Sequence, residues 1–259
     1  MQVDLLCSGS KGNCCLIRTA AASILIDCGA PAKSYLMKAL EEAGQSKEDI
    51  DGIFITHTHK DHIGQLRHFS ALPVYSYCEI ELKDPKHQPV PLDAHHIRPM
   101  DPVFIKDLKI TPVVLSHDSG PTTGFVVEDA VSRLVYVTDT GYVKNENMPF
   151  LKGADYYIFE SNHDMEMLLS TNRPAWLKQR IVSDTGHLCN QDSARLLSEL
   201  VTDNTKNIVL AHLSDEANTP ALAMEALMDA FAHKGISLKD INVCAAEQKA
   251  VVSFGKYTK

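Results

Sequence analysis

The stretch ITHTHKDHIG, residues 55–64, places His57, His59, Asp61 and His62 within six consecutive positions. An apolar run precedes it, so the cluster is expected to follow a β-strand. Two imidazoles separated by one residue can bind one ion from a single turn, and the Asp-His pair that follows can bind a second. Packing does not call for so many imidazoles in a row. The stretch therefore predicts a metal centre, with an unusually polar loop as the alternative.

Short apolar, β-branched runs recur on both sides of this stretch and predict further strands. They lie at 3–7, 14–18, 23–27, 52–56, 108–115, 124–128, 133–139, 156–160, 207–212, 241–245 and 250–254. Helical periodicity predicts helices at 33–43, 62–69, 174–183, 190–201 and 218–234, with Pro174 at a first helical position and Asn190 and Thr219 as caps. Because hairpins come first and later strands alternate with helices, we expect two mixed sheets packed face to face with helices outside, an α/β sandwich.

Several predicted strands end in side chains that can bind metals, as at a shared active-site rim. Besides His57, these are His117, Asp139, Asn162-His163 and His212, with Asp27 after an earlier strand. Asp27 is expected either to help a turn or to orient a ligand histidine. The aromatic residues Trp176, Tyr156 and Tyr157 are expected in the core, with platforms for base stacking as the alternative, and Lys249 is expected to be structural.

Nitrogen and oxygen donors without sulfur suit Zn²⁺, Mn²⁺, Fe²⁺ or Co²⁺. The seven candidate ligands are His57, His59, Asp61, His62, His117, Asp139 and His212. Seven ligands are enough for two divalent ions roughly 3.5–4 Å apart that share one carboxylate and a bridging hydroxide, and Asp139 is the best candidate for the shared carboxylate.

Composition and charge restrict the class of protein. The 259 residues are 44% hydrophobic and 22% charged, as in ordinary globular proteins. No run approaches the roughly 20 apolar residues of a membrane span, and the start has no secretory signal. Seven scattered cysteines without a C-x-x-C pair fit reduced thiols, so we expect a cytoplasmic protein. The net charge of −8 argues against broad wrapping of nucleic acid, but bound cations would make an active-site mouth locally positive.

The motif THTHKDH resembles the signature of the metallo-β-lactamase superfamily, whose fold is a four-layer αββα sandwich. The other motifs follow in the order of that superfamily: LIDCG with Asp27, LSHDS with His117, VTDTG with Asp139 and LAHLS with His212. The resemblance spans about residues 3 to 254, so we expect a single domain over 1–259. The segments GSKGN (9–13), ESNHD (160–164) and GHLCN (186–190) are similar to the YycJ/WalJ branch, in which serine is expected where Cys189 stands.

The resemblance implies a distribution of ligands. His57, His59 and His117 would hold one ion, Asp61, His62 and His212 the other, with Asp139 between them. His187 resembles the additional histidine of superfamily nucleases, which meets a phosphate or protonates the leaving oxygen; its alternative role is to cap the next helix. We therefore expect catalytic roles for His187, Asp61 and Asp139.

Substrate contacts are expected in two further segments. Ser8, Ser10 and Asn13 lie beside glycines, where backbone N–H groups could meet an anion, although a glycine hairpin would explain the same residues. Asn162 and His163 could contact a phosphate or cap the following helix.

The branch implies a phosphodiesterase, most specifically a 5′-to-3′ DNA exonuclease. A dizinc β-lactamase would carry cysteine in place of Asp139, and a redox diiron protein would carry an acid in place of His59. Only 72 residues lie between Asp139 and His212, too few for a large cap domain, so we expect an open mouth. The alternatives are a hydrolase of a thioester, lactone or cyclic phosphodiester, or a non-catalytic regulatory protein stabilised by metal.

Overall fold

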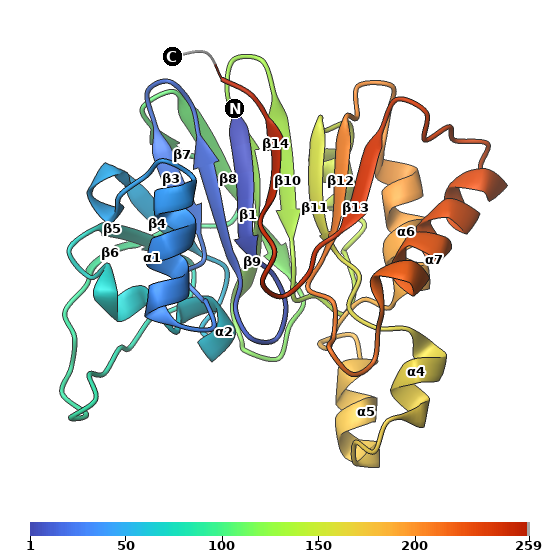
Figure 1. Cartoon of the computed structure of the whole chain (residues 1–259), viewed down its shortest axis with the longest axis horizontal. Helices are drawn as coiled ribbons and strands as arrows, with labels where there is room; N and C mark the ends of the chain where they lie inside the picture. The colour runs from blue at the N-terminus through green and yellow to red at the C-terminus, as the bar shows by residue number, and fades with distance from the viewer. Residues whose placement is uncertain (258–259) are drawn as a thin grey trace.

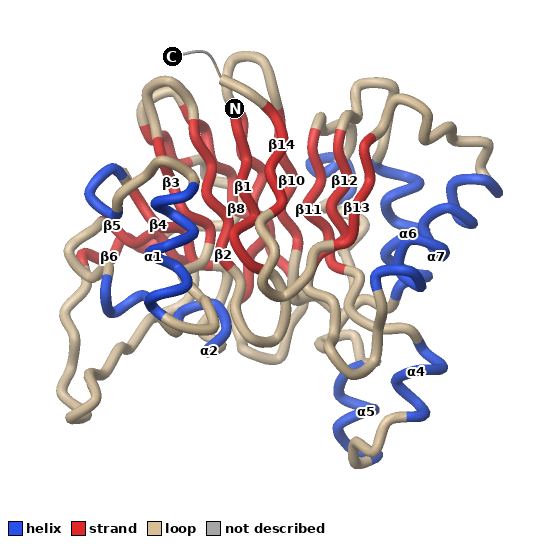
Figure 2. The backbone as a smooth tube through the Cα atoms, in the orientation of Figure 1, coloured by secondary structure: helices blue, strands red, loops and turns tan. Residues whose placement is uncertain are grey.

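The computed structural model describes residues 1–257 and contains two seven-stranded sheets packed face to face (Figures 1 and 2). Helices cover both outer faces, which confirms the expected four-layer αββα sandwich. Within residues 1–257, no helix is both long enough and apolar enough to cross a membrane.

The first sheet has the order β14-β1-β2-β3-β4-β5-β6. Its strands are β1 (Gln2–Cys7), β2 (Cys14–Arg18), β3 (Ser23–Ile26), β4 (Gly52–Ile55), β5 (Pro73–Ser76), β6 (Asp93–His96) and β14 (Val252–Gly255). β1, β2 and β3 pair as antiparallel hairpins, whereas β3 to β6 pair in parallel.

The second sheet has the order β13-β12-β11-β10-β9-β8-β7. Its strands are β7 (Val103–Ile105), β8 (Leu108–Leu115), β9 (Thr122–Glu128), β10 (Arg133–Val137), β11 (Tyr156–Glu160), β12 (Asn207–Ala211) and β13 (Asn242–Ala245). β10 to β13 pair in parallel. The carboxyl ends of these strands therefore meet at one edge, where ligands bind in open sheets.

The helices differ from the predicted ones in a few places. They are α1 (Lys33–Glu42), α2 (Lys60–Ile63), α3 (Met148–Leu151), α4 (Met165–Ser170), α5 (Ala175–Ile181), α6 (Asn190–Leu200) and α7 (Pro220–His233), with 3₁₀ turns η1 (Lys47–Asp49) and η2 (Leu66–His68). The helix predicted over 62–69 is wrong as one element: Gly64 follows α2, and the N–H of Gln65 turns away to the carbonyl of Cys28 at 2.9 Å.

The predicted helix starts are one residue off in two of three cases. Thr219 caps α7, as predicted, by accepting a hydrogen bond from the N–H of Leu222 at 3.2 Å. Pro174 is the cap of α5 rather than its first residue. Cys189, not Asn190, caps α6, because its sulfur accepts from the N–H of Asp192 at 3.5 Å.

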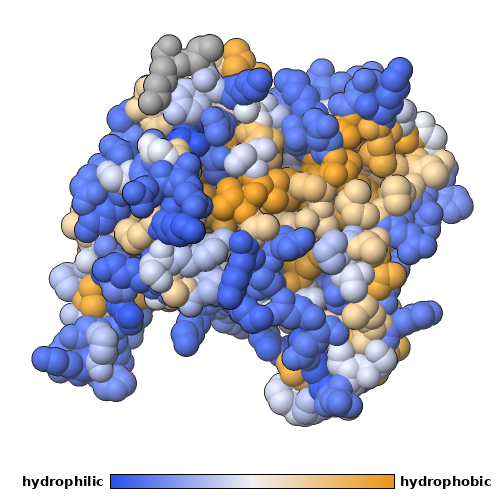
Figure 3. Space-filling model, viewed as in Figure 1, coloured by the Kyte–Doolittle hydropathy of each residue, from blue (hydrophilic) through white to orange (hydrophobic). Residues whose placement is uncertain are grey.

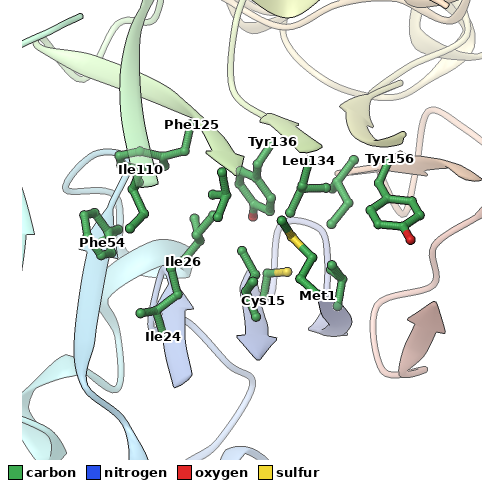
Figure 4. Close-up of a cluster of buried hydrophobic side chains, with 14 of the residues drawn as sticks. Met1, Cys15, Ile24, Ile26, Phe54, Ile110, Phe125, Leu134, Tyr136 and Tyr156 are labelled. Carbon is green, nitrogen blue, oxygen red and sulfur yellow. The ribbon is translucent and has the colours of Figure 1, made fainter. Parts of the chain in front are cut away.

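The main core lies between the two sheets (Figure 4). Successive side chains of a strand point to opposite faces, so Ile24 and Ile26 enter this core while Leu25 packs on the outer face with α1 residues. In β10, Tyr136 faces the inner core and Val135 packs toward α6 and α7. Both faces of these strands are buried, which explains their continuous apolar sequences.

Tyr156 and Tyr157 are buried, as predicted, but the prediction that Trp176 lies in the core is wrong: its side chain is 66% exposed. Trp176 lies on α5, which packs with α4 as a pair that projects beyond the sheets on the side of α2 (Figure 1). Leu177 and Ile181 supply the apolar contacts of this short helix, so Trp176 remains at the surface.

Candidate metal centre

The candidate ligands converge at the edge where the parallel strands end. His57 follows β4 of the first sheet, whereas Asp139 and His212 follow β10 and β12 of the second. His117 follows β8 and reaches the same place. Because both sheets send residues to this edge, the candidate centre spans the interface between them.

Three histidines form one group. The ring centroids of His57 and His59 lie 4.8 Å apart, and each ring lies 5.0 Å from His117. His59 Nδ1 and His117 Nε2 are 3.3 Å apart. One nitrogen from each ring lies within 4.8 Å of the others, a spacing that permits binding of a common cation.

A second group contains Asp61, His62 and His212, whose ligand atoms lie within 4.8 Å of one another. Asp139 lies between the two groups. One of its oxygens is 3.1 Å from His62 Nε2, and the other is 3.7 Å from His117 Nε2 and 3.5 Å from His212 Nδ1. Asp139 is thus placed to serve both groups.

Three residues of the site have left-handed backbone conformations. Asp27, Asp139 and His212 have φ values of 59°, 60° and 56°, although this region is uncommon for residues with a side chain. Each of them comes just after a strand. Local strain at functional sites persists when surrounding contacts fix it; here the N–H of His212 donates to Ser8 Oγ at 2.8 Å, and Asn162 donates to the carbonyl of His212 at 2.8 Å.

Each of three ligand histidines is held from behind by an oxygen acceptor. His62 Nδ1 donates to Asp27 at 2.7 Å, and His117 Nδ1 donates to the carbonyl of Gly186 at 3.1 Å. His212 Nδ1 donates to Glu160 at 3.1 Å. Such bonds fix the tautomer and leave Nε2 unprotonated; the Nε2 of His62 lies 3.0 Å from the Asn13 amide. Asp27 therefore orients His62, a candidate ligand, and the N–H of Thr56 donates to Asp27 at 2.9 Å.

Several buried atoms at the centre lack hydrogen-bond partners among residues 1–257: His57 Nε2, His212 Nε2 and Asp139 Oδ2. The approach of His62 to Asp139 does not have hydrogen-bond geometry. An unpaired buried donor or acceptor costs roughly 1–3 kcal/mol. Divalent cations held by the two groups would satisfy these atoms, and the nitrogen and oxygen donor set fits Zn²⁺, Mn²⁺ or Fe²⁺.

Glu160 is a component of the site that the sequence analysis did not single out. It ends β11, is fully buried, and receives hydrogen bonds from His187 Nδ1 at 2.7 Å and from the N–H of Thr140 at 2.8 Å. Burial alone would raise the pKa of Glu160, but the neighbouring His187 lowers that pKa to about 2. Its position at a strand end, which drew attention to the other residues, is the signal that could have identified it.

His187 lies beside both groups. Its ring centroid is 5.0 Å from that of His117 and 5.3 Å from that of His212. With Nδ1 bound to Glu160, Nε2 is the nitrogen left for a substrate, and His187 lines a cavity of about 500 Å³ at the centre. The same cavity is lined by Asp61, Asp139, Arg173 and Arg180.

The five expected substrate contacts fall into three kinds of position. Ser10 and Asn162 line the cavity. Ser8 and Asn13 are buried braces instead: Ser8 holds the backbone of His212, and the Asn13 amide lies 3.0 Å from His62 Nε2 and 3.3 Å from Asp61. His163 is buried with neither ring nitrogen bonded to any of residues 1–257, and burial lowers its pKa to about 4.

The sequence is similar to that of known proteins along most of its length. The profile of the β-lactamase superfamily domain matches residues 22–213. The chain is 35% identical over 245 residues to the exodeoxyribonuclease YycJ of Bacillus anthracis, with 92% of each chain covered. It is 34% identical over 242 residues to the exodeoxyribonuclease WalJ of Streptococcus pneumoniae, with 91% of this chain and 90% of that protein covered.

A solved structure agrees with the arrangement of the sheets. The metallo-β-lactamase fold protein YhfI from Bacillus subtilis superposes with a TM-score of 0.71 at 20% identity, covering 98% of this chain and 99% of that one. At this identity the likeness concerns the fold.

Proposed function

The chain belongs to the β-lactamase superfamily, in the branch of the YycJ and WalJ proteins, and from this membership we propose that it is a metal-dependent exonuclease that degrades DNA from the 5′ end. The expected resemblance to this branch is confirmed. The observation that carries the proposal is the placement of His187, held by a buried carboxylate, beside the convergent ligand set and inside one cavity.

Each of the two groups of candidate ligands would hold one divalent cation. His57, His59 and His117 would hold one cation, and Asp61, His62 and His212 the other, with Asp139 contacting both. When bound, such a pair supplies a Lewis acid for the phosphoryl oxygen and lowers the pKa of a water molecule to near neutrality. Asp61 and Asp139 supply the negative charge that retains the cations.

His187 supplies the proton for the leaving oxygen. Glu160 accepts the Nδ1 hydrogen bond and fixes the ring, so Nε2 faces the substrate. A positioned imidazole of this kind contributes roughly 10²–10⁴-fold to a rate by general acid catalysis. Ser10 and Asn162 line the same cavity and are placed to contact a phosphate or sugar of the strand.

A small phosphodiester is the second candidate substrate. A cavity of about 500 Å³ falls in the range that encloses small ligands. Arg173 and Arg180 at its wall favour an anion over a neutral lactone or thioester.

The seven cysteines all carry free thiols. Free thiols persist in a reducing compartment, so we place this nuclease in the cytoplasm.

The proposal is tested with end-labelled single- and double-stranded DNA and RNA, each with 5′-phosphate or 5′-hydroxyl ends, incubated with protein loaded with Zn²⁺, Mn²⁺ or Fe²⁺. We expect DNA shortened progressively from its 5′ end. Asp139→Asn should lower the rate by orders of magnitude, because that residue faces both ligand groups. Asp203→Asn is the matched control, since Asp203 is exposed and precedes β12 at the opposite edge.

DNA that stays intact with every metal, while a cyclic phosphodiester is consumed, would replace the exonuclease with the second candidate. Equal rates for wild type and Asp139→Asn would refute the metal-dependent mechanism itself.

A further inference from the structure

The helical pair α4–α5 stands apart from the sandwich. It projects beyond the edge of the sheets that carries the site (Figure 1). In the space-filling view the projection shows polar surface broken by apolar patches (Figure 3). A small separate cluster of Leu168, Ile181 and Ala217, with Leu177 packed against it, holds the pair to the body. This cluster does not include all the apolar side chains of the pair, and several of the others are exposed.

Trp176 is the largest of those displayed side chains. It is 66% exposed and is the only tryptophan of the chain. An indole that contributes to neither core nor anchoring cluster exposes a large apolar area to water. Exposed aromatic rings on a basic surface are the elements on which unpaired bases stack.

Two arginines lie within four residues of Trp176. Arg180 is four residues after Trp176 in α5, a spacing that places both side chains on one face of the helix, whereas Arg173 lies in the loop before Pro174, the cap of α5. Both line the cavity that contains Asp139 and His187. The loop before α5 and the helix itself thus carry two arginines at the wall of the cavity and, within four residues of each, the exposed Trp176.

Both arginines form ion pairs with carboxylates. Arg173 pairs with Glu216 at 3.0 Å, and Arg180 pairs with Asp118. One partner in each pair is well exposed, Glu216 at 64% and Arg180 at 45%, whereas Arg173 and Asp118 are 22% and 24% exposed. Solvent weakens an ion pair that has an exposed partner, so a nucleic-acid phosphate can compete with each carboxylate for its arginine. Lys178 Nζ donates a hydrogen bond to the carbonyl of Leu169 at 2.5 Å and so connects α5 to the end of α4.

We propose that α5 is a platform for single-stranded DNA, on which Trp176 stacks against an unpaired base while Arg173 and Arg180 bind the phosphates on either side. The inference rests on the proposed nuclease function and specifies its substrate as a strand with unpaired bases near the cleavage site. Bases inside a duplex are stacked on both sides, and only the outer face of each terminal pair is exposed, so a duplex offers Trp176 far fewer faces than a single strand.

The single tryptophan makes the test direct, because intrinsic tryptophan fluorescence reports Trp176 alone. Holoenzyme is titrated with a phosphorothioate-linked twelve-residue oligothymidylate, which resists cleavage, and separately with a blunt duplex of equal length. We expect saturable quenching by the single strand and little quenching by the duplex. In fluorescence anisotropy with the labelled single strand, Trp176→Ala should raise Kd about 10-fold or more, because the variant loses the ring on which a base stacks.

Two variants control the binding experiment. Trp176→Phe keeps an aromatic face and should retain most of the affinity. Phe104→Ala removes an aromatic side chain that is likewise 66% exposed, but on the edge strand β7, and should leave Kd unchanged.

Binding without quenching, equal quenching by the duplex, absence of binding, or an unchanged Kd in Trp176→Ala would each overturn the platform. These outcomes are separate from failure of the proposed function. A protein that binds and quenches but cleaves no DNA keeps the platform and loses the nuclease, whereas a protein that cleaves single strands without quenching keeps the nuclease and loses the platform.

Discussion

Glu160 shows how one buried carboxylate can organise two imidazoles. Its side chain accepts from His187 at 2.7 Å and from His212 at 3.1 Å, so the ring expected to donate a proton and a ring expected to hold a cation share one support. The N–H of Thr140, next to Asp139, also donates to Glu160 at 2.8 Å. The side chain of Glu160 thus fixes the positions of His187, His212 and the backbone next to Asp139 relative to one another.

Replacing Glu160 with glutamine should therefore damage metal binding and turnover together. Glu160→Gln keeps the volume but removes the charge, and loss of such a support typically costs 10–100-fold in metal affinity or activity. We expect a decrease of that order in kcat and in the affinity for the more weakly bound cation, measured by steady-state kinetics and calorimetric titration. Glu225→Gln, at an exposed position of α7, should change neither.

A double-mutant cycle separates positioning from simple structural support. If Glu160 acts on turnover through His187, Glu160→Gln should cost little further kcat in a His187→Ala background. Fully additive losses would show that Glu160 does not act through His187.

The sequence analysis identified the site residues that belong to short, recognisable motifs. The spacing of His57, His59, Asp61 and His62 is visible in one short motif, because a single turn must present all four. Glu160 carries no such pattern, since its partners are brought near it only by the pairing of β11 with β10 and β12. Trp176 was misplaced because an apolar side chain at helical spacing looks the same whether the helix packs on a core or projects from it.

At the scale of elements, the motif turn is fixed by backbone contacts from two other loops. The N–H of Asn13 donates to the carbonyl of Asp61 at 2.8 Å, and that of Cys28 donates to the carbonyl of His62 at 2.7 Å. Gly29 lies against the same turn and bonds to the carbonyl of Asn13 at 3.0 Å. The loops after β1 and β3 thus set the position of α2.

The close approach at Gly29 makes a sharp prediction. A Cβ there would lie 1.7 Å from the carbonyl oxygen of Asp61, and Gly29 does not need a positive φ, so Gly29→Ala tests crowding alone. Because the neighbour is backbone, we expect a loss of about 3 kcal/mol of unfolding free energy, together with weaker cation binding. Urea unfolding and metal titration measure the two effects.

Gly44→Ala is the matched control for this change. Gly44 has a φ of +71° and no atom within 4 Å of a Cβ, so alanine there should cost about 1–2 kcal/mol through backbone strain and leave metal affinity unaltered. Unchanged metal affinity in Gly29→Ala would show that this contact does not position the motif.

The elements that the sequence predicted are those buried on both faces, such as β3, β4, β10 and β12. β6 was not predicted because all four of its residues, Asp93–His96, are exposed and show no alternation. A helix after Asn162 and His163 was anticipated without bounds, because α4 has only six residues; its cap is Asp164, which accepts from the N–H of Met167 at 2.8 Å. Short exposed elements are defined by their neighbours more than by their own sequences.

At the scale of the molecule, the candidate centre joins the two halves of the sandwich. His57 and the α2 residues come from the first sheet, and His117, Asp139 and His212 come from the second. Polar contacts connect the halves at this edge: the N–H of His212 donates to Ser8 Oγ at 2.8 Å, and the N–H of Thr123 donates to the carbonyl of Thr56 at 3.0 Å. A cation pair bound across it would therefore act as a clamp between the sheets as well as a catalyst.

Removing the metal should accordingly lower the stability of the whole chain. A ligand that binds only the folded state at 100 to 1,000 times its Kd contributes about 2.7–4.1 kcal/mol, and for a protein of this size each kcal/mol corresponds to roughly 2–4 °C in Tm. Chelation should lower Tm by about 5–15 °C, with both sheets unfolding in one transition, as measured by calorimetry and far-ultraviolet circular dichroism. His57→Ala should lose most of this metal-dependent gain, because His57 Nε2 is one of the buried atoms that a cation would satisfy. Identical Tm values for chelated and metal-replete wild type would show that the buried cluster is stable without cations and does not clamp the sheets.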